Sequence, residues 1–333
     1  MSEKTKIFGD IHDIALKCLD KDQLENYSIY RNKFDQASNF ITVFNHPIHV
    51  DIELDNICNY ACSFCPIGQP ESELGQYYQK KKEISVEKIK EILSELKKIG
   101  TNSVQLSLVN EPLANKHLFE VLRFASDLKF EDLYMVSNAS LLTENKSIAI
   151  LESGLTKIQF SLDGFSEKTY EMNRFTKVKK SGMYNRVLKN ILEFLNLKKK
   201  MKKNFPLVRV SFIELDENKH EFNDFKKFWE DKVDAIHYQK LINYRKENKS
   251  SDFYDENMIR CNMPNFRLAI KSDGLVKPCC VGYGEKITIG DIYKNTISEI
   301  WNSEIMKNLQ KMHLEYKSFE NKHCKECLKN TKF

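Results

Sequence analysis

Three cysteines, Cys58, Cys62 and Cys65, lie within eight residues in the stretch DNICNYACSFCPIG. A structural zinc site normally takes four protein ligands and a disulfide takes two, so three thiols suit neither. Thiolates are soft ligands for zinc, copper(I) or iron–sulfur clusters. On a four-iron cluster, three thiolates leave one iron available for an amino and carboxylate pair. We therefore expect an open, reactive iron–sulfur cluster, with zinc and a distant fourth ligand as the alternative.

A second group of thiols occupies the last quarter of the chain, and no cysteine separates it from the first group. Its members are Cys261, Cys279, Cys280, Cys324 and Cys327. The start of the chain lacks the apolar segment of a signal peptide, and no stretch is long enough to span a bilayer. We expect a soluble, cytoplasmic protein. In a reducing compartment, nine cysteines indicate metal or redox chemistry rather than disulfides.

The charge of the chain is modest for its length. The 333 residues carry a formal net charge of +5, and Lys and Glu are interspersed through most of the sequence. This composition is typical of a Lys-rich solvated surface and does not require a nucleic-acid partner. We expect neither nucleic acid nor a membrane as a partner.

Strand-like and helix-like segments alternate through the body of the chain. Short segments rich in β-branched residues predict six strands, and apolar residues at helical spacing predict helices between them. Ser85 is placed to cap one helix, and Gly100 to end it. The expected strands are 49–54, 103–108, 132–138, 157–164, 207–215 and 235–242, and the expected helices are 86–99, 116–129, 143–153, 183–200 and 219–231.

This alternation predicts an α/β fold, a partial (βα)6 TIM-like barrel, followed by a small C-terminal α+β domain. We divide the chain into a mostly helical extension (1–45), the barrel (46–254) and the C-terminal domain (255–333). Within the last part we expect a hairpin turning at Asp273–Gly274 and a helix over 296–313. The first cysteine group directly follows the first strand, at the end of the sheet where active sites of such folds lie.

The order of motifs resembles the radical S-adenosylmethionine (radical SAM) superfamily from about residue 48 onward. C-x3-C-x2-C, with the aromatic Phe64 before its last cysteine, follows the first strand. The segments LVNEPL, SNA, SLDG and EKTYEMNR then stand where the family has its further cofactor contacts, with Asn110 in place of a glycine. The resemblance implies S-adenosylmethionine bound at a [4Fe–4S] cluster, which yields a 5′-deoxyadenosyl radical that abstracts a substrate hydrogen.

The same resemblance implies roles for residues outside the cysteine motif. Glu111 would bind the methionine amino group, and Arg174 would hold the methionine carboxylate. Asn138 and Ser161 would contact the ribose. The ordinary alternatives are an exposed loop acid for Glu111, strand-end turn residues for Asn138 and Ser161, and a solvated surface position for Arg174.

The second cysteine group resembles the SPASM/twitch extensions of this superfamily, which carry auxiliary clusters. The pattern C-x12-G-x4-C includes Gly274. The resemblance implies a second [4Fe–4S] cluster, for which a zinc knuckle is the alternative. Three roles are open for Cys280: it could replace Cys279 as a ligand, be an inert buried thiol, or donate a hydrogen atom to a substrate radical. The expected ligands of the second cluster are Cys261, Cys279, Cys324 and Cys327.

A closed auxiliary cluster suits electron transfer, and this single-cluster arrangement is similar to the aminocyclitol dehydrogenases. We expect an oxidoreductase that dehydrogenates or epimerises an aminocyclitol or sugar derivative, served by a flavodoxin- or ferredoxin-type electron donor. Tyr244, Arg245 and His237 lie near the end of the sixth strand, where a base for a hydroxyl proton could sit. The alternatives are a radical SAM maturase of a ribosomal peptide and a zinc-stabilised binding protein without catalytic activity.

Overall fold

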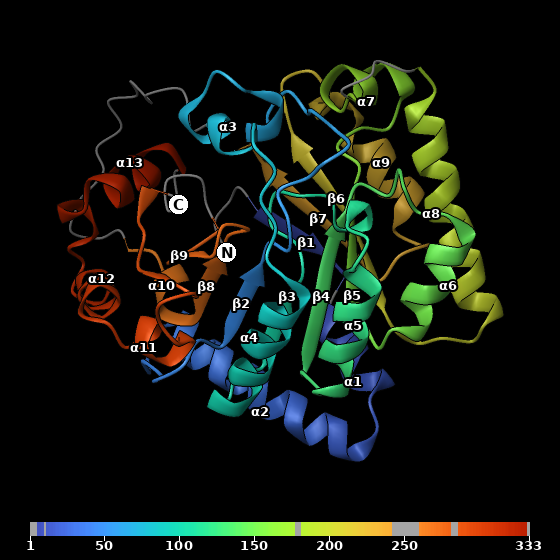
Figure 1. Cartoon of the computed structure of the whole chain (residues 1–333). Coiled ribbons are helices and arrows are strands. Elements are labelled where there is room, and N and C mark those ends of the chain that lie inside the picture. Colours follow the sequence, from blue (N-terminus) through green and yellow to red (C-terminus); the bar gives the residue numbers. More distant parts are fainter. Residues whose placement is uncertain (1–4, 10, 177–180, 242–259, 281–285, 332–333) are drawn as a thin grey trace.

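The strands form one sheet that wraps into an open barrel (Figure 1). The computed structural model describes residues 5–9, 11–176, 181–241, 260–280 and 286–331. Strands β2 to β7 pair in sequence order and in parallel, which confirms the predicted α/β fold with a parallel core. They span His49–Ile52 (β2), Ser103–Gln105 (β3), Asp132–Ser137 (β4), Lys157–Ser161 (β5), Leu207–Glu214 (β6) and Ala235–Lys240 (β7).

The crossover helices form where apolar residues recur at helical spacing, and they pack against the outer face of the sheet (Figure 1). In α4 the Ser85 hydroxyl accepts a hydrogen bond from the Lys88 amide, and Gly100 ends the helix at φ +98°, as expected. The crossover helices are Val86–Ile99 (α4), Leu118–Asp127 (α5), Glu144–Glu152 (α6), Met183–Lys200 (α8) and Phe222–Trp229 (α9). A short helix, Glu167–Asn173 (α7), was not predicted.

The N-terminal segment closes the amino end of the barrel. Helices Ile11–Cys18 (α1) and Lys21–Ser38 (α2) confirm its helical character, and their residues Ile11 and Tyr30 share an apolar cluster with Leu207 of β6. The segment also contains a strand, Thr5–Phe8 (β1), which pairs antiparallel with β7. Its sequence TKIF does not strictly alternate apolar and polar residues, so the pattern did not identify this strand.

The C-terminal segment extends the same sheet. Strand Arg267–Ile270 (β8) pairs in parallel with β2 and forms the predicted hairpin with Leu275–Lys277 (β9), turning through Gly274 at φ +87°. The remaining elements are Met263–Phe266 (α10), Gly290–Asp291 (β10), Ile297–Trp301 (α11), Glu304–Leu314 (α12) and Lys322–Thr331 (α13). The division of the chain at residue 254 stays a prediction, because that boundary lies outside the described ranges.

The expectation of one helix over 296–313 is wrong, since two helices occupy this segment. Helix α11 ends at Trp301, and α12 begins at Glu304. The Ser303 hydroxyl accepts a hydrogen bond from the Met306 amide, so Ser303 caps α12 instead of continuing α11. The helical spacing of the apolar residues alone did not reveal this break.

Candidate functional site

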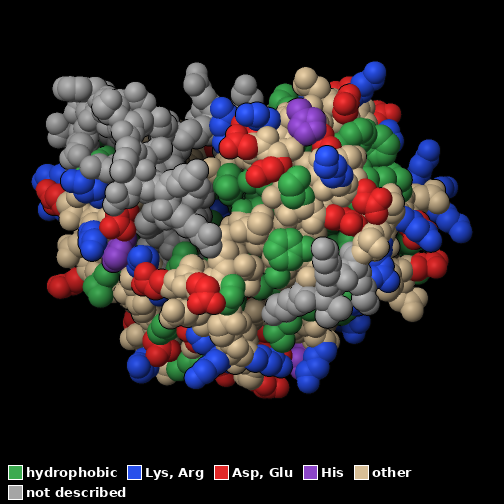
Figure 2. Space-filling model, turned by 90° about the horizontal axis from the view of Figure 1, so that it is seen from above, with side chains coloured by type: hydrophobic (Ala, Val, Ile, Leu, Met, Phe, Trp, Pro, Cys, Tyr) green, Lys and Arg blue, Asp and Glu red, His purple; other side chains and the backbone are tan. Residues whose placement is uncertain are grey.

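The first cysteine group lies on the loop after β2, at the carboxyl end of the barrel. Figure 2 looks down on this end, where Lys and Arg side chains lie mostly toward the rim and hydrophobic side chains nearer the middle.

Polar side chains hold the start of the cysteine loop in place. Asp55 accepts hydrogen bonds from the Ile57 amide (2.9 Å) and the Asn115 side chain (2.6 Å). The side chain of Asn56 bonds to the backbone of Lys80 and Lys82 (2.8 and 2.9 Å).

Backbone hydrogen bonds hold the cysteines in a tight turn. The Tyr60 amide donates to Cys58 Sγ (3.4 Å), and the Cys65 amide donates to the Cys62 carbonyl (3.0 Å). A Cβ atom on Gly68 would lie 2.2 Å from the carbonyl oxygen of Cys62, so only glycine fits this close approach.

The segment after α7 runs beside the cysteine loop and brings Arg174 to it. The Ala61 amide donates to the Phe175 carbonyl (2.8 Å), and the Ser63 amide to the Asn173 carbonyl (3.0 Å). Nη1 of Arg174 therefore lies 4.0 Å from the sulfur of Cys62. The alternative of a solvated surface position for Arg174 is wrong, because the residue is only 6% exposed.

Asp163 orients the Arg174 guanidinium. Its Oδ2 accepts from Nε (2.8 Å) and from Nη2, while Oδ1 accepts from the Ile213 amide (2.8 Å). Burial alone would lower the pKa of Arg174, but this carboxylate and the neighbouring Cys62 outweigh it and raise the pKa above its usual value, so the cation is retained. The ring of Phe64 lies 5.5 Å from the guanidinium. The SLDG motif contained Asp163, but its pairing with Arg174 was not predicted.

Glu111 is buried at the same end of the barrel, so the alternative of an exposed loop acid is wrong. Its carboxylate accepts from the Leu113 amide (3.0 Å), the Ser137 hydroxyl (2.8 Å) and the Asn138 amide (2.6 Å). Burial raises its pKa against the opposing effect of these hydrogen bonds. A carboxylate offers about four acceptor positions, so Glu111 retains capacity for one more donor, such as an ammonium group.

Asn138 connects the end of β4 to the cysteine loop. Its Nδ2 donates to Asn59 Oδ1 (3.0 Å) and lies 3.9 Å from the sulfur of Cys58. Its Oδ1 accepts from the Ser140 amide (2.9 Å), as a turn residue would. Ser161 ends β5 opposite Ser211 and is half-buried. The structure thus brings Asn138 to the first cysteine group, and leaves Ser161 at the carboxyl edge of the sheet.

The arrangement of the three thiols fits a cluster in which each cysteine binds a different iron atom. Burial and the charge of Glu111 raise the pKa of Cys58, and burial raises that of Cys62 against the opposing effect of Arg174. Within the described ranges, no three His, Cys, Asp or Glu side chains converge on a position for one metal ion. A [4Fe–4S] cluster binds each thiolate through a different iron, and amide donors to the sulfurs are a usual part of such sites.

Four cysteines of the second group are electrostatic neighbours. Burial, together with the charges of Cys261, Cys324 and Cys280, raises the pKa of Cys327 to about 12. The amide of Cys261 donates to His313 Nδ1 (3.2 Å), and the amide of Cys324 donates to Asn321 Oδ1 (3.1 Å). The structure therefore brings Cys280 close to two of the expected ligands, Cys261 and Cys327, and leaves the choice between Cys279 and Cys280 open.

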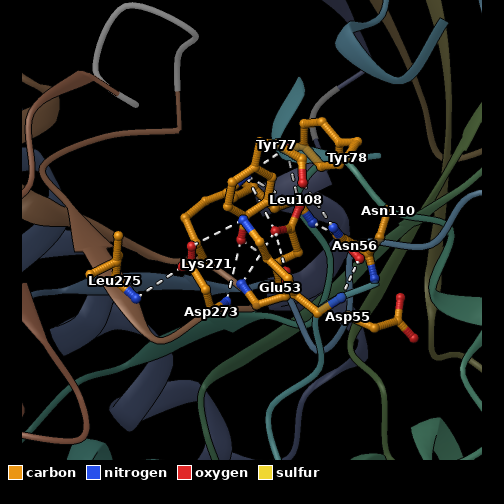
Figure 3. A network of polar contacts seen from close by, with 12 residues as sticks. Glu53, Asp55, Asn56, Tyr77, Tyr78, Leu108, Asn110, Lys271, Asp273 and Leu275 are labelled. Atoms are coloured by element: carbon orange, nitrogen blue, oxygen red, sulfur yellow. Dashed lines mark hydrogen bonds and ion pairs between the residues drawn. The ribbon is translucent and has the colours of Figure 1, made fainter. Parts of the chain in front are cut away.

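A buried polar network joins the cysteine loop to the C-terminal hairpin (Figure 3). Lys271 Nζ donates to Tyr78 Oη (2.6 Å) and lies 3.3 Å from the carboxylate of Glu53, which directly follows β2. The amide and hydroxyl of Ser272 also donate to Glu53 (3.3 and 3.1 Å). Tyr78 follows helix Glu73–Tyr77 (α3), the first helix after the cysteines. The network ties three segments that are distant in sequence.

The expected base candidates Tyr244 and Arg245 lie outside the described residues. His237 lies on β7, opposite Ile7 of β1. Burial and the charge of Arg209 lower the pKa of His237 to about 4, so this imidazole is neutral near pH 7.

Two family models match the chain. The Radical SAM superfamily model matches residues 52–228, and the model of an iron–sulfur cluster-binding domain, SPASM, matches residues 261–328. Together these matches include both cysteine groups. No helix in the described part of the chain is long and apolar enough to cross a membrane.

Two curated relatives show different extents of similarity. The "Probable GTP 3',8-cyclase" of Saccharolobus solfataricus is 26% identical over 303 residues, which are 79% of this chain and 92% of that protein. The "PqqA peptide cyclase" of Bradyrhizobium diazoefficiens is 32% identical over 126 residues, 37% of this chain. The chain spans only 30% of the length of that cyclase.

Two solved structures share the fold. BtrN in complex with AdoMet and 2-DOIA superimposes with a TM-score of 0.52 at 16% identity, over 84% of this chain and 91% of BtrN. Streptococcus suis SuiB bound to precursor peptide SuiA gives a TM-score of 0.61 at 15% identity, over 86% and 71% of the two chains. Membership of the matched family implies S-adenosylmethionine and [4Fe–4S] clusters as cofactors. With its cysteine loop, its order of motifs and its parallel barrel, the chain belongs to the radical SAM superfamily and carries a SPASM iron–sulfur extension.

Proposed function

We propose that the protein is a radical SAM oxidoreductase that dehydrogenates or epimerises a polar metabolite of the aminocyclitol or sugar class. The observation that carries the proposal is the convergence of Glu111, Asn138 and Arg174 on the loop of three cysteines. The match to BtrN, a structure that holds AdoMet and 2-DOIA, supports a small-molecule substrate, since it extends over most of both chains.

Each residue of the site has a distinct task in this proposal. Cys58, Cys62 and Cys65 would bind the first cluster, and Arg174, oriented by Asp163, would hold a carboxylate by charge-assisted hydrogen bonds. Glu111 would accept from an ammonium group, and Asn138 and Ser161 would bind ribose hydroxyls. When bound, the cluster and S-adenosylmethionine supply the radical chemistry of the family. The protein's own contribution is to position these groups and to exclude water.

We further propose that the C-terminal cysteines hold an auxiliary [4Fe–4S] cluster that accepts an electron during substrate oxidation. Dehydrogenation of a secondary alcohol removes one hydrogen atom, one proton and one electron. Tyr244 and Arg245 are the proposed candidates for handling the proton, and a flavodoxin- or ferredoxin-type protein is the proposed external electron donor. Epimerisation would instead return a hydrogen atom to the substrate, and the thiol of Cys280 is the candidate donor; one electron from the proposed external donor and one proton from water would then restore the thiol.

Modification of a ribosomal peptide is the second candidate function. The structural match to SuiB bound to precursor peptide SuiA and the partial similarity to a PqqA peptide cyclase favour it. Gene neighbours distinguish the two candidates: a short precursor-peptide gene supports the peptide, and sugar-biosynthesis genes support the metabolite.

Anaerobic reconstitution tests the proposal. We expect about eight irons per chain, for two four-iron clusters, and reductive cleavage of S-adenosylmethionine by dithionite. Two zincs without iron would contradict it and support a zinc-stabilised binding protein.

The reaction type has its own test, with aminocyclitols and sugars as substrates in D2O. A carbonyl product without deuterium indicates dehydrogenation, and a deuterated stereoisomer indicates epimerisation. If the Cys280→Ala variant forms an epimerised product at the same rate as the wild type, Cys280 is not the hydrogen donor.

A further inference from the structure

The inner face of the barrel is lined by polar and charged side chains, in contrast to its apolar outer face. Val208 and Val210 of β6 are fully buried in the core that the crossover helices cover. Side chains alternate along a strand, so Arg209 between them faces the barrel interior. Its Nη2 donates to Tyr134 Oη (3.2 Å) on β4, two strands away, which a side chain of β6 reaches across the concave face.

Ion pairs neutralise the other cations on the inner face. Arg267 pairs with Asp51 (2.5 and 2.6 Å), and Lys157 pairs with Asp132 (2.9 Å). Lys271 pairs with Glu53 in the network of Figure 3. Arg209 differs, because no carboxylate in the described part of the chain lies within ion-pair distance of it.

Two residues that face each other on β5 and β6 each carry a buried polar atom without a hydrogen-bond partner. One is Nε of Arg209, and the other is Oε1 of Gln159, a residue that is 8% exposed. Gln159 and Arg209 are directly opposite each other in the register of β5 and β6. A buried donor and a buried acceptor of this kind are costly unless a bound group completes their hydrogen bonds.

The groups around Arg209 do not neutralise its charge. Lys157 on β5 is a second cation, which pairs with Asp132, and burial together with the charge of Arg209 lowers the pKa of this lysine. His237 on the other neighbouring strand is neutral near pH 7. The phenol of Tyr134 accepts a hydrogen bond from Arg209 but is itself uncharged, since burial raises its pKa. None of these three groups therefore neutralises the charge of the guanidinium.

The position of this pair relative to the expected cofactor contacts follows from the strand register. Gln159 lies two residues before Ser161, and Arg209 two residues before Ser211, on the same faces of their strands. Two residues along a strand span about 6.6 Å, so the pair lies one pleat deeper in the barrel than the carboxyl edge. Helices α1 and α2 cover the opposite end, so the side of the cysteine loop is the one from which a ligand could approach the pair.

We propose that Arg209 and Gln159 form an oxyanion subsite for the substrate. Arg209 binds a carboxylate or phosphate of the substrate, and Gln159 Oε1 accepts a hydrogen bond from a neighbouring hydroxyl or amino group. The inference rests on the proposed function. It adds that the polar metabolite on which the enzyme acts is an anion. The methionine carboxylate of the cofactor is assigned to Arg174 and does not occupy this subsite.

The test uses the anaerobically reconstituted protein with S-adenosylmethionine bound. Inorganic phosphate and acetate are titrated at constant ionic strength against chloride, and binding is followed by the thermal unfolding midpoint. Glucose, glucuronate and glucose 6-phosphate then form a matched neutral and anionic series. The variants are Arg209→Gln and, as a control, Arg186→Gln, which removes an exposed arginine of α8.

We expect an anion to stabilise the wild type and the control, and its apparent Kd to rise about tenfold or more in Arg209→Gln. Preference for glucuronate or for glucose 6-phosphate identifies the anion as carboxylate or phosphate. Equal anion binding by Arg209→Gln and the wild type would overturn the proposal. If Arg209→Gln does not fold, Arg209→Lys, which keeps the charge but not the planar fork, is expected to bind the anion several-fold more weakly than the wild type.

Cleavage of S-adenosylmethionine distinguishes a failure of the anion subsite from a failure of the proposed function. In the absence of substrate, Arg209→Gln is expected to cleave the cofactor at the wild-type rate, and loss of this substrate-free cleavage would place Arg209 in the cofactor site and overturn the subsite. A wild type that binds the anion through Arg209 but does not cleave S-adenosylmethionine would refute the proposed function and leave the anion site standing.

Discussion

The side chains around the first cysteine group are held by other buried side chains, so their geometry does not depend on the exposed loop alone. Asp163 binds Arg174 through two nitrogens, and Arg174 in turn lies beside the sulfur of Cys62. A planar guanidinium that is fixed at Nε and Nη2 still presents N–H groups on Nη1. The pair therefore combines a fixed orientation with the capacity to bind a further anion.

Replacing Arg174 by Gln should weaken binding of S-adenosylmethionine about tenfold to a hundredfold, because a charge-assisted hydrogen bond is lost. Equilibrium binding to the reconstituted variant measures this effect. The exposed Arg186→Gln variant should bind like the wild type. Iron content is measured in parallel, and an unchanged affinity at full iron content would remove Arg174 from the cofactor site.

Cys279 and Cys280 provide a matched pair of variants for the second cluster. The family spacing predicts Cys279 as the ligand, so Cys279→Ala should lower the iron content from about eight to about four per chain, while Cys280→Ala keeps about eight. Iron analysis with absorption spectroscopy gives the answer. The opposite result would make Cys280 the ligand, consistent with its position beside Cys261 and Cys327.

Among the elements, the C-terminal hairpin is attached to the barrel both by strand pairing and by a buried ion pair. Strand β8 pairs with β2, and Lys271, in the turn after β8, pairs with Glu53 beyond the end of β2. Glu53 is completely buried, and Lys271 is 1% exposed. The aromatic rings of Tyr77 and Tyr78 flank the ammonium group at 4.8 and 4.9 Å, which connects the pair to α3.

The variant Lys271→Met should destabilise the protein by about 3–5 kcal/mol, because it leaves the Glu53 carboxylate buried without its cation. The double variant Glu53→Gln/Lys271→Met removes both charges and should recover a large part of that loss. Denaturant unfolding under anaerobic conditions compares the three chains. Equal destabilisation by the single and double variants would show that packing, and not the unpaired charge, is responsible.

For the molecule as a whole, the two cysteine groups lie beside different parts of one continuous sheet. The first group follows β2 at the carboxyl end of the barrel, and the second is contributed by the residues before α10, the residues after β9, and α13. This separation is consistent with the two roles proposed above, radical formation at the first cluster and electron acceptance at the second. The pairing of β8 with β2 and the contact of Lys271 with Glu53 hold the C-terminal segment in a fixed position against the barrel.

Removing the auxiliary cluster should therefore abolish substrate oxidation but leave cleavage of S-adenosylmethionine intact. The variant Cys324→Ala/Cys327→Ala is expected to retain reductive cleavage of S-adenosylmethionine and to lose substrate oxidation by more than tenfold. Cleavage is measured as 5′-deoxyadenosine, and oxidation as the carbonyl product. Wild-type product formation without the second cluster would contradict its role as the electron acceptor.

Local sequence patterns predicted much of the fold and part of the site. The parallel strands β2 to β7, the caps of α4 and the hairpin at Gly274 follow from hydrophobic periodicity and backbone preference, which act within a few residues. The spacing of Cys58, Cys62 and Cys65 indicated an open cluster for the same reason, since three ligands on one short loop are necessarily close in space.

Tertiary structure alone decided which distant groups meet. The pairing of Arg174 with Asp163, the burial of Glu111, and the opposition of Gln159 and Arg209 depend on strand register and on the path of the α7 segment. Neighbours on adjacent strands are set by long-range pairing, and a shift of one residue would turn each side chain to the other face of the sheet. The sequence by itself thus determined the type of chemistry, while the fold decided which charges are paired and which remain available for a ligand.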